Sequence, residues 1–398
     1  MRAKICSEPE EKYFLSLVRC ALRGETPDSV PQDVNIVNIL NLAKLHNLCE
    51  LISYVVPSIS PEPERVIVDK FKRLNLTGIA QQVHQDIEME ALSREFVSSG
   101  VDMLPLKGTV IKPLYPSPDM RSMCDIDILV RPEQLEQAKA IMLDKLGFNA
   151  ENIVIGEHDL GFKKPPFINI ELHHAMTDKS VSADAYEYYK DIWSLARLKN
   201  GSEHIYELSH EDFYIHHIEH MAKHYRSGGC GVRAFCDVFL LISKYQDEMD
   251  FEYIEGVLKR LGLDVFESHV RCAALKWFGD GAGDAVSDII ESFVLHGGSF
   301  GFAEDKETAD IASKYSSDKG VNKLSFYWKK IFLPYQNMKS GYPVLIKCPI
   351  LLPFCWIHRA FDRLLFKRDR IKHQIELAAS NDAIAEYVSH MNAVGLSK

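Results

Sequence analysis

The sequence predicts an α+β protein in which a small mixed-sheet core is flanked by an N-terminal and a C-terminal helical region. Two observations predict this class. Apolar residues recur at helical spacing near both ends of the chain, and between about residues 100 and 200 short β-rich runs alternate with helical ones. We therefore divide the chain into an N-terminal helical region (1–97), a mixed-sheet core (98–204) and a C-terminal helical region (205–398).

The N-terminal region predicts three helical segments that are separated by proline-bearing turns. They cover residues 11–22, 34–56 and 64–100. The core predicts strands and helices in alternation, over residues 101–106 (strand), 108–115 (helix), 125–130 (strand), 132–147 (helix), and then β-rich runs over 152–156, 160–164 and 167–176. The C-terminal region returns to helical spacing over residues 210–225, 232–246, 251–262 and 269–279.

Composition limits the partners and the compartment. The chain has 398 residues, 46% of them hydrophobic, and a formal net charge of -10, so nucleic acid is not the favoured partner. The nine cysteines are odd in number, scattered and free of any C-x-x-C pair, which indicates a reducing, cytoplasmic location. The first residues do not have the pattern of a secretory signal.

The most apolar segment, residues 342–357, contains Lys347 and three prolines and is shorter than the roughly 20 residues that span a bilayer. We expect no transmembrane segment. The following segment, residues 358–373, predicts a basic amphipathic helix. We expect it to dock on the apolar loop before it, and we keep peripheral membrane contact as the alternative.

Two aspartates stand at the start of a run that otherwise has a buried pattern, "DIDILV". Because side chains alternate along a strand, Asp125 and Asp127 share one face and Ile126 faces the core. Like charges this close need a cation, and Mg²⁺ with oxygen ligands is the common solution. The run "FINIELHHAM" places Glu171 on the polar face of another strand, so pairing of the two strands would add a third carboxylate. Three carboxylates could hold two metal ions.

A strand that runs into Lys107 and Gly108 and then into a helix is an arrangement that presents backbone N–H groups to an anion. Arg121 could add positive charge. The pattern is not a Walker A motif, and a turn glycine beside a solvated lysine is the alternative.

The segments "LKG", "LYPSPDMRSMCDIDILV" and "INIELHH", in this order and spacing, resemble the uncharacterised nucleotidyltransferase family of the polymerase-beta-like nucleotidyltransferase superfamily. The resemblance covers residues 104–174, and more loosely the helical segment that follows. It implies a nucleotidyltransferase core, with Asp125 and Asp127 as metal ligands and Glu171 as the third carboxylate. It also implies that Lys107, Gly108 and Arg121 lie near the triphosphate. Lys107-Gly108 stands where the superfamily usually has Gly-Ser, with Thr109 as the nearest hydroxyl.

A histidine-rich helix is predicted downstream, with His217, His220 and His224 on one face. We expect His220 and His224 to contact the substrate or its phosphates, and keep a zinc site and ordinary packing as alternatives. Met221 stands where a zinc protease would have its glutamate. In the next predicted helix, Arg233 and Asp237 are spaced i, i+4, as in an ion pair.

Together with this resemblance, the observations predict a Mg²⁺-dependent enzyme that transfers the NMP group of an NTP, ATP above all, to an unidentified acceptor with release of pyrophosphate. We expect the acceptor to be a small molecule, a sugar, a peptide or a protein. The alternative is a catalytically inactive nucleotide-binding regulatory or interaction protein of the same fold. A histidine-centred metallohydrolase ranks third.

Overall fold

The computed structural model describes residues 6–156, 159–177, 179, 182–298, 332–339, 341–366 and 381–397. The chain divides into two compact units. The first comprises Met1–Tyr225 and Cys230–Phe300, and the second comprises Arg226–Gly229 and Gly301–Lys398.

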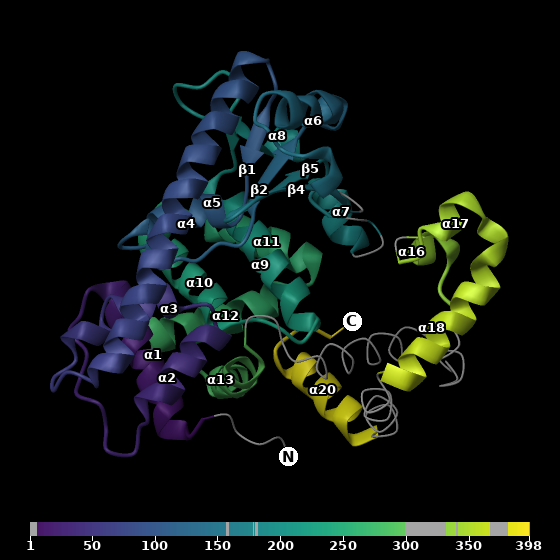
Figure 1. The fold of residues 1–398 in the computed structure, drawn as a ribbon. Coiled ribbons are helices and arrows are strands. Elements are labelled where there is room, and N and C mark those ends of the chain that lie inside the picture. Colours follow the sequence, from purple (N-terminus) through teal and green to yellow (C-terminus); the bar gives the residue numbers. More distant parts are fainter. Residues whose placement is uncertain are drawn as a thin grey trace. The chain divides into compact units, whose positions relative to one another are not determined.

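Four helices open the first unit (Figure 1): α1 (Glu8–Arg23), α2 (Ile36–Leu45), α3 (Cys49–Ser53) and α4 (Arg65–Ser98). Helix α1 begins at a capping box of Ser7 and Glu10 and ends at Gly24, which has a left-handed backbone. Helix α4 is 34 residues long, contacts α3 near its start, and packs against the sheet near its end. It therefore links the N-terminal helices to the sheet.

A five-stranded mixed sheet forms the core of this unit, as the strand pattern predicts. Its strands are β1 (Met103–Pro105), β2 (Ile126–Val130), β3 (Val154–Ile155), β4 (Asp159–Lys164) and β5 (Ile168–His173), in the spatial order β1-β2-β5-β4-β3. Strands β2 and β5 are parallel neighbours, and the other pairs are antiparallel. The α+β class with helical flanks is confirmed.

One face of the sheet is buried against α4 and α6 (Leu135–Asp144). Ile126, Ile128 and Val130 of β2 join Ile170 and Leu172 of β5 in one apolar cluster with residues of both helices. Because side chains alternate along a strand, the residues between them point to the other face. That face carries the polar residues Asp127, Glu171 and His173.

The connection between β1 and β2 contains the short helix α5 (Gly108–Ile111), followed by the 3-10 turns η2 (Lys112–Leu114) and η3 (Pro118–Met120). The predicted single helix over residues 108–115 is therefore split in two. Pro113 has no N–H to donate to the helical ladder, which is why the α-helix does not continue.

Helices return after the sheet, and the polar face of the sheet is bordered by the first long one, α9 (His210–Arg226). Helices α10 (Val232–Tyr245), α11 (Phe251–Leu261), α12 (Asp264–Phe278) and α13 (Ala285–Gly297) follow. Helix α12 packs against both α10 and α1. The remaining short elements of this unit are α7 (Ala183–Tyr189), α8 (Ile192–Leu195), β6 (Arg197–Leu198), β7 (Tyr206–Glu207), η1 (Val56–Ser58), η4 (Pro132–Gln134) and η5 (Ala150–Asn152).

The described part of the second unit is helical, with a small apolar cluster of Met338, Leu345 and Cys355. Its elements are α16 (Tyr335–Lys339), α17 (Val344–Lys347), η6 (Pro349–Leu351), α18 (Leu352–Phe366) and α20 (Asn381–Ala393). The basic helix predicted over 358–373 coincides with the end of α18 up to Phe366, and the rest of it lies outside the described residues. Among the described helices, none has the length and apolar character that crossing a bilayer requires.

Candidate active site

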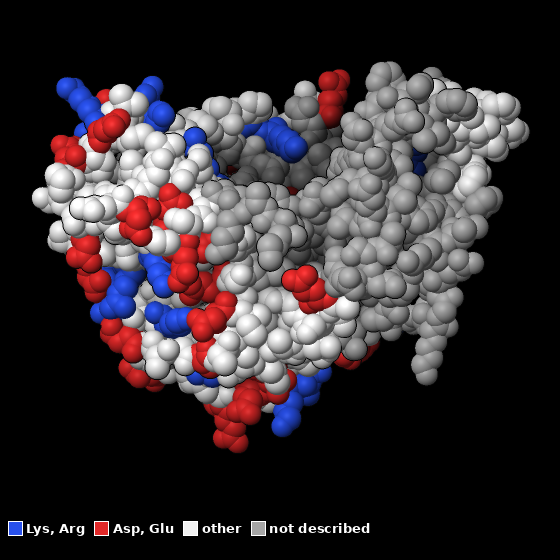
Figure 2. All heavy atoms as spheres, turned by 90° about the horizontal axis from the view of Figure 1, so that it is seen from below, with Lys and Arg blue, Asp and Glu red and all other residues white. Residues whose placement is uncertain are grey.

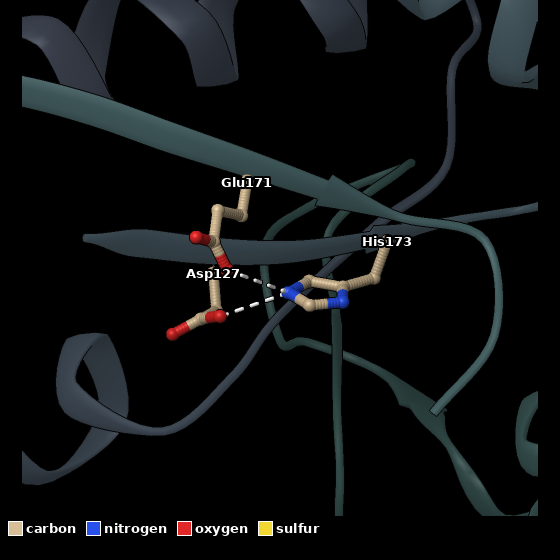
Figure 3. A group of neighbouring side chains, drawn as sticks. All are labelled: Asp127, Glu171 and His173. Atoms are coloured by element: carbon tan, nitrogen blue, oxygen red, sulfur yellow. Dashed lines mark hydrogen bonds and ion pairs between the residues drawn. The ribbon is translucent and has the colours of Figure 1, made fainter. Parts of the chain in front are cut away.

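Two neighbouring parallel strands bring Asp127 and Glu171 together. The register pairs Asp127 of β2 directly with Glu171 of β5, so both carboxylates stand side by side on the polar face (Figure 3). His173, two residues after Glu171, lies on the same face. Its Nε2 is 2.8 Å from Asp127 Oδ1 and 3.7 Å from Glu171 Oε2. One oxygen of each acid and one nitrogen of the histidine lie within 4.8 Å of one another.

Lys107 and Asp125 complete what we call the acid cluster: Asp125, Asp127, Glu171, Lys107 and His173. Lys107 Nζ donates to Asp127 Oδ1 at 2.7 Å. Its backbone has a φ of 48°, a left-handed conformation that is uncommon for a residue other than glycine. Asp125 immediately precedes β2 and is half-buried. The cluster thus contains three carboxylates and one ammonium group, so it has an excess of negative charge.

The pKa values report this excess. Burial and then the charge of Asp127 raise the pKa of Asp125, and burial followed by Asp127 and Asp125 raises the pKa of Glu171. Burial would also raise the pKa of Asp127, but hydrogen bonding to His173 and the charge of Lys107 lower it to about 2. Asp127 is therefore the stabilised anion, while its two neighbours are held together at an electrostatic cost.

The donor set fits a hard divalent cation. Carboxylate oxygens are the ligands that Mg²⁺ and Mn²⁺ prefer, and a cation among them would relieve the repulsion that raises the pKa values of Asp125 and Glu171. Asp127, Glu171 and His173 are the group among the described residues whose ligand atoms are placed to hold a metal ion. The sequence pattern did not single out His173 as part of this site. The alternation that placed Glu171 on the polar face also places His173 there, and was the available signal.

A small cavity of about 40 Å³ adjoins the acid cluster. Lys107 and His173 line it from the sheet side, and His216, His220 and Lys223 of α9 line it from the other. Burial and the charge of Lys107 lower the pKa of His216 to about 3, and the same two causes lower that of His220. Both imidazoles are therefore neutral at pH 7.

The structure distributes the four histidines of α9 differently from the predicted face. His220 lines the cavity, and His224 Nε2 lies 3.1 Å from His220 Nε2. His216 also lines the cavity, and neither of its ring nitrogens has a hydrogen-bond partner among the residues that the structure describes. His217 instead points toward α10, with its Nε2 at 3.4 Å from the carbonyl of Ala234. A shared face of His217, His220 and His224 is therefore not observed.

Arg121 lies in a different cluster. The residue is 7% exposed, and its guanidinium donates through Nε and Nη2 to the two carboxylate oxygens of Asp237, both at 2.8 Å. The hydroxyl of Tyr115 donates to the same carboxylate at 2.8 Å. We call Arg121, Asp237 and Tyr115 the arginine cluster. Arg233 donates instead to the backbone and side chain of Ser122, so the i, i+4 spacing of Arg233 and Asp237 did not identify the partner of either.

Gly108 follows Lys107 of the acid cluster in the chain and lies close to Arg121 of the arginine cluster. A Cβ at this position would lie 2.5 Å from Met123 Sδ and 2.6 Å from Arg121 Nη1. A side chain at position 108 would therefore force the side chains of Met123 and Arg121 to shift, and Arg121 is held by two hydrogen bonds to Asp237. Glycine avoids this crowding, and its φ is not positive. The residue before it, Lys107, holds the strained backbone.

A family model described as uncharacterised nucleotidyltransferase matches residues 32–279, which include the whole sheet and helices α9 to α12. The match covers more than half of the chain, and the chain belongs to this family. It is thus a nucleotidyltransferase, an enzyme that transfers phosphorus-containing groups and uses an NTP. Neither the curated proteins nor the solved structures contain a match to it.

Proposed function

We propose that this nucleotidyltransferase moves the NMP group of an NTP, ATP being the expected donor, to an acceptor hydroxyl, phosphate or amine and releases pyrophosphate. The observation that carries the proposal is the register of β2 and β5, which sets Asp127 directly beside Glu171 with Asp125 next to them. Carboxylates in excess can bind a divalent cation, and one of them can accept a proton at the same place.

We assign the metal to the acids, in keeping with their oxygen donors. Asp125, Asp127 and Glu171 would hold Mg²⁺, and bound Mg²⁺ would offset phosphate charge and orient the triphosphate. His173 Nε2 donates to Asp127 Oδ1 at 2.8 Å, since that carboxylate is ionised, and so fixes the orientation of the carboxylate. Lys107 keeps a positive charge at the same oxygen.

The chemistry forms one bond and breaks one. The acceptor oxygen or nitrogen attacks the α-phosphorus, and the bond from that phosphorus to the bridging oxygen of pyrophosphate breaks. Glu171 is the proposed acceptor of the proton that the nucleophile loses, because its carboxylate lies beside Asp127 on the polar face of the sheet, where the reacting atoms would be held. Pyrophosphate leaves with the electron pair of the broken bond.

We propose that the phosphates occupy the side of the cluster that faces α9. Lys107, His220 and Lys223 line the cavity there, and His224 is in contact with His220. Gly108 allows the close approach of the chain around it. Arg121 lies close to Gly108, but its guanidinium is already bound by Asp237. Its proposed role is therefore to hold the β1–β2 connection in place.

The acceptor is proposed to be a small molecule, a sugar, a peptide or a protein. The net charge of -10 disfavours nucleic acid, and Figure 2 shows acidic and basic side chains interspersed over the described part of one face. All nine cysteines are unpaired, which supports the cytoplasmic location that we propose.

The test is pyrophosphate release by the purified full chain from each of the four NTPs with Mg²⁺, across a panel of small-molecule, sugar and peptide acceptors. Asp127→Asn should abolish release, whereas the same substitution at the exposed Asp144, at the end of α6, should not. Release that survives Asp127→Asn would contradict the assignment. Tight NTP binding without release from any acceptor would favour the inactive nucleotide-binding protein instead.

A further inference from the structure

Helix α4 exposes an apolar stripe on the face that points away from the sheet. Its buried face contains Phe71, Leu92 and Phe96, each 0% exposed. On the opposite face Leu76 is 65% exposed, Val83 50% and Ile87 60%. Single exposed apolar residues are ordinary, but a row of them along one helix is characteristic of a binding surface.

The stripe belongs to a longer pattern with heptad spacing. Residues 69, 73, 76, 80, 83, 87, 90 and 94 follow one another at alternating intervals of four and three, as the contact positions of a coiled coil do. In chain order these residues are Asp69, Arg73, Leu76, Ala80, Val83, Ile87, Glu90 and Arg94. All of them are exposed except Asp69, whose side chain is 49% exposed within a half-buried residue.

Two copies of α4 that run antiparallel to each other would match apolar residues with apolar residues and acidic residues with basic ones. If a second α4 runs antiparallel across the first, the central apolar residues meet, and a charge of one sign faces a charge of the other at each end. The opposed positions are Leu76 with Ile87, Ala80 with Val83, Arg73 with Glu90, and Asp69 with Arg94. Each of these pairs occurs twice about a two-fold axis at the middle of the helix.

We propose that the chain forms a homodimer through antiparallel packing of α4, with its two-fold axis between residues 80 and 83. Charge complementarity favours a second copy over a lipid surface. A membrane-binding helix surrounds its apolar stripe with lysine and arginine, whereas here acidic and basic residues alternate along the same line.

The area that α4 offers to a second copy limits the expected affinity of the dimer. A helix of 34 residues is about 51 Å long and, with side chains, about 10 to 12 Å wide. It therefore presents roughly 500 Å² per copy, which places the pair near the lower limit of about 1,000 Å² for a specific interface. The dimer is reversible, and its population depends on protein concentration.

The experiment is sedimentation velocity of the full chain across a concentration series. The wild-type chain should shift from monomer to dimer as its concentration rises. Leu76→Asp, at a position that is 65% exposed, should raise the dissociation constant at least about a hundredfold, because it places a charge in the apolar centre. Lys259→Glu, at an exposed position of α11 outside the proposed interface, should leave it unchanged.

A charge exchange tests the antiparallel register. Arg73→Glu and Glu90→Arg should each weaken the dimer about tenfold, because each places like charges opposite one another. The double variant restores opposite charges and should return the dissociation constant to that of the wild type. A wild-type chain that remains monomeric at every concentration overturns the proposal, and so does a dimer that is insensitive to Leu76→Asp or a double variant that does not recover.

Discussion

The acid cluster and the arginine cluster are both buried groups of charged side chains, yet they differ in charge balance. In the arginine cluster one guanidinium meets one carboxylate, and both oxygens of Asp237 accept hydrogen bonds. In the acid cluster three carboxylates share one ammonium group, that of Lys107. A balanced cluster needs nothing from outside the chain. An unbalanced one is suited to a cation and to the phosphates that come with it.

Removing one charge from each cluster in turn should have opposite effects on the transfer rate and on the free energy of unfolding. Glu171→Gln should lower the rate of transfer about a thousandfold, or by about 4 kcal/mol of transition-state stabilisation. It should not lower the free energy of unfolding, because the raised pKa of Glu171 shows that its negative charge is unfavourable in the folded state. Kinetics and urea denaturation of the same variant measure the two effects. A clear loss of stability would show that Glu171 supports the fold.

The opposite result is expected in the arginine cluster. Asp237→Asn should lower the free energy of unfolding by about 3 kcal/mol, because it leaves the buried charge of Arg121 without its counter-charge. The double variant Arg121→Met, Asp237→Asn should regain part of this loss. Asp247→Asn, on an exposed residue, serves as the matched control in the same denaturation series. A double variant no more stable than Asp237→Asn would contradict the charge-balance argument.

A buried histidine outside both clusters shows what burial does to a lone titratable group. His46 is 0% exposed, Val232 N–H donates to its Nδ1 at 3.3 Å, and burial lowers its pKa to about 4. Since the unfolded pKa is about 6.5, the unfolded chain binds the proton first, and stability falls as the pH drops from about 6.5 toward 4. Between pH 7 and pH 5 this contribution is about 2 kcal/mol.

His46→Asn removes this titration. The difference in unfolding free energy between wild type and variant should therefore shrink by about 2 kcal/mol from pH 7 to pH 5. His84→Asn, at an exposed histidine, provides the comparison. An unchanged difference would show that the imidazole does not lose its proton on burial.

The smallest expected effect concerns Lys107, the only lysine bonded to the acid cluster among the described residues. Lys107→Met should increase the affinity for Mn²⁺ without nucleotide about tenfold, because it removes the positive charge 2.7 Å from Asp127 Oδ1. The same change should weaken NTP binding, because a cation near the phosphates is lost. Isothermal titration with Mn²⁺ and with a non-hydrolysable NTP measures both, with Lys244→Met as the control. Weaker Mn²⁺ binding would mean that Lys107 organises the cluster rather than competing with the metal.

Local patterns predicted the elements of the site well because they report directly on strands. Alternation in "DIDILV" and "FINIELHHAM" identified β2 and β5 and placed Asp127 and Glu171 on their polar faces. The same alternation places His173 on the polar face of β5, but it did not indicate that this histidine contacts Asp127. What it could not supply was the pairing itself, since many strand orders are compatible with the same alternation.

Contacts between distant residues were beyond this reasoning. Arg121 was assigned from its sequence neighbours to the phosphate, and nothing local indicated Asp237, which lies 116 residues away. The reason for Gly108 was also hidden, because the atoms that exclude a side chain there belong to residues 13 and 15 positions later. The i, i+4 spacing of Arg233 and Asp237 was a helix-surface argument, and the two residues turned out to have other partners.

By itself, the sequence determined the α+β class, the succession of helices and strands, and the acidic residues that we propose for the chemistry, because side-chain periodicity and residue type are local properties. Only the tertiary structure decided which charges are balanced and which are in excess. The balance at a carboxylate depends on which cations lie within a few ångströms of it, and Asp127 and Asp237 find theirs 20 and 116 residues away in the chain.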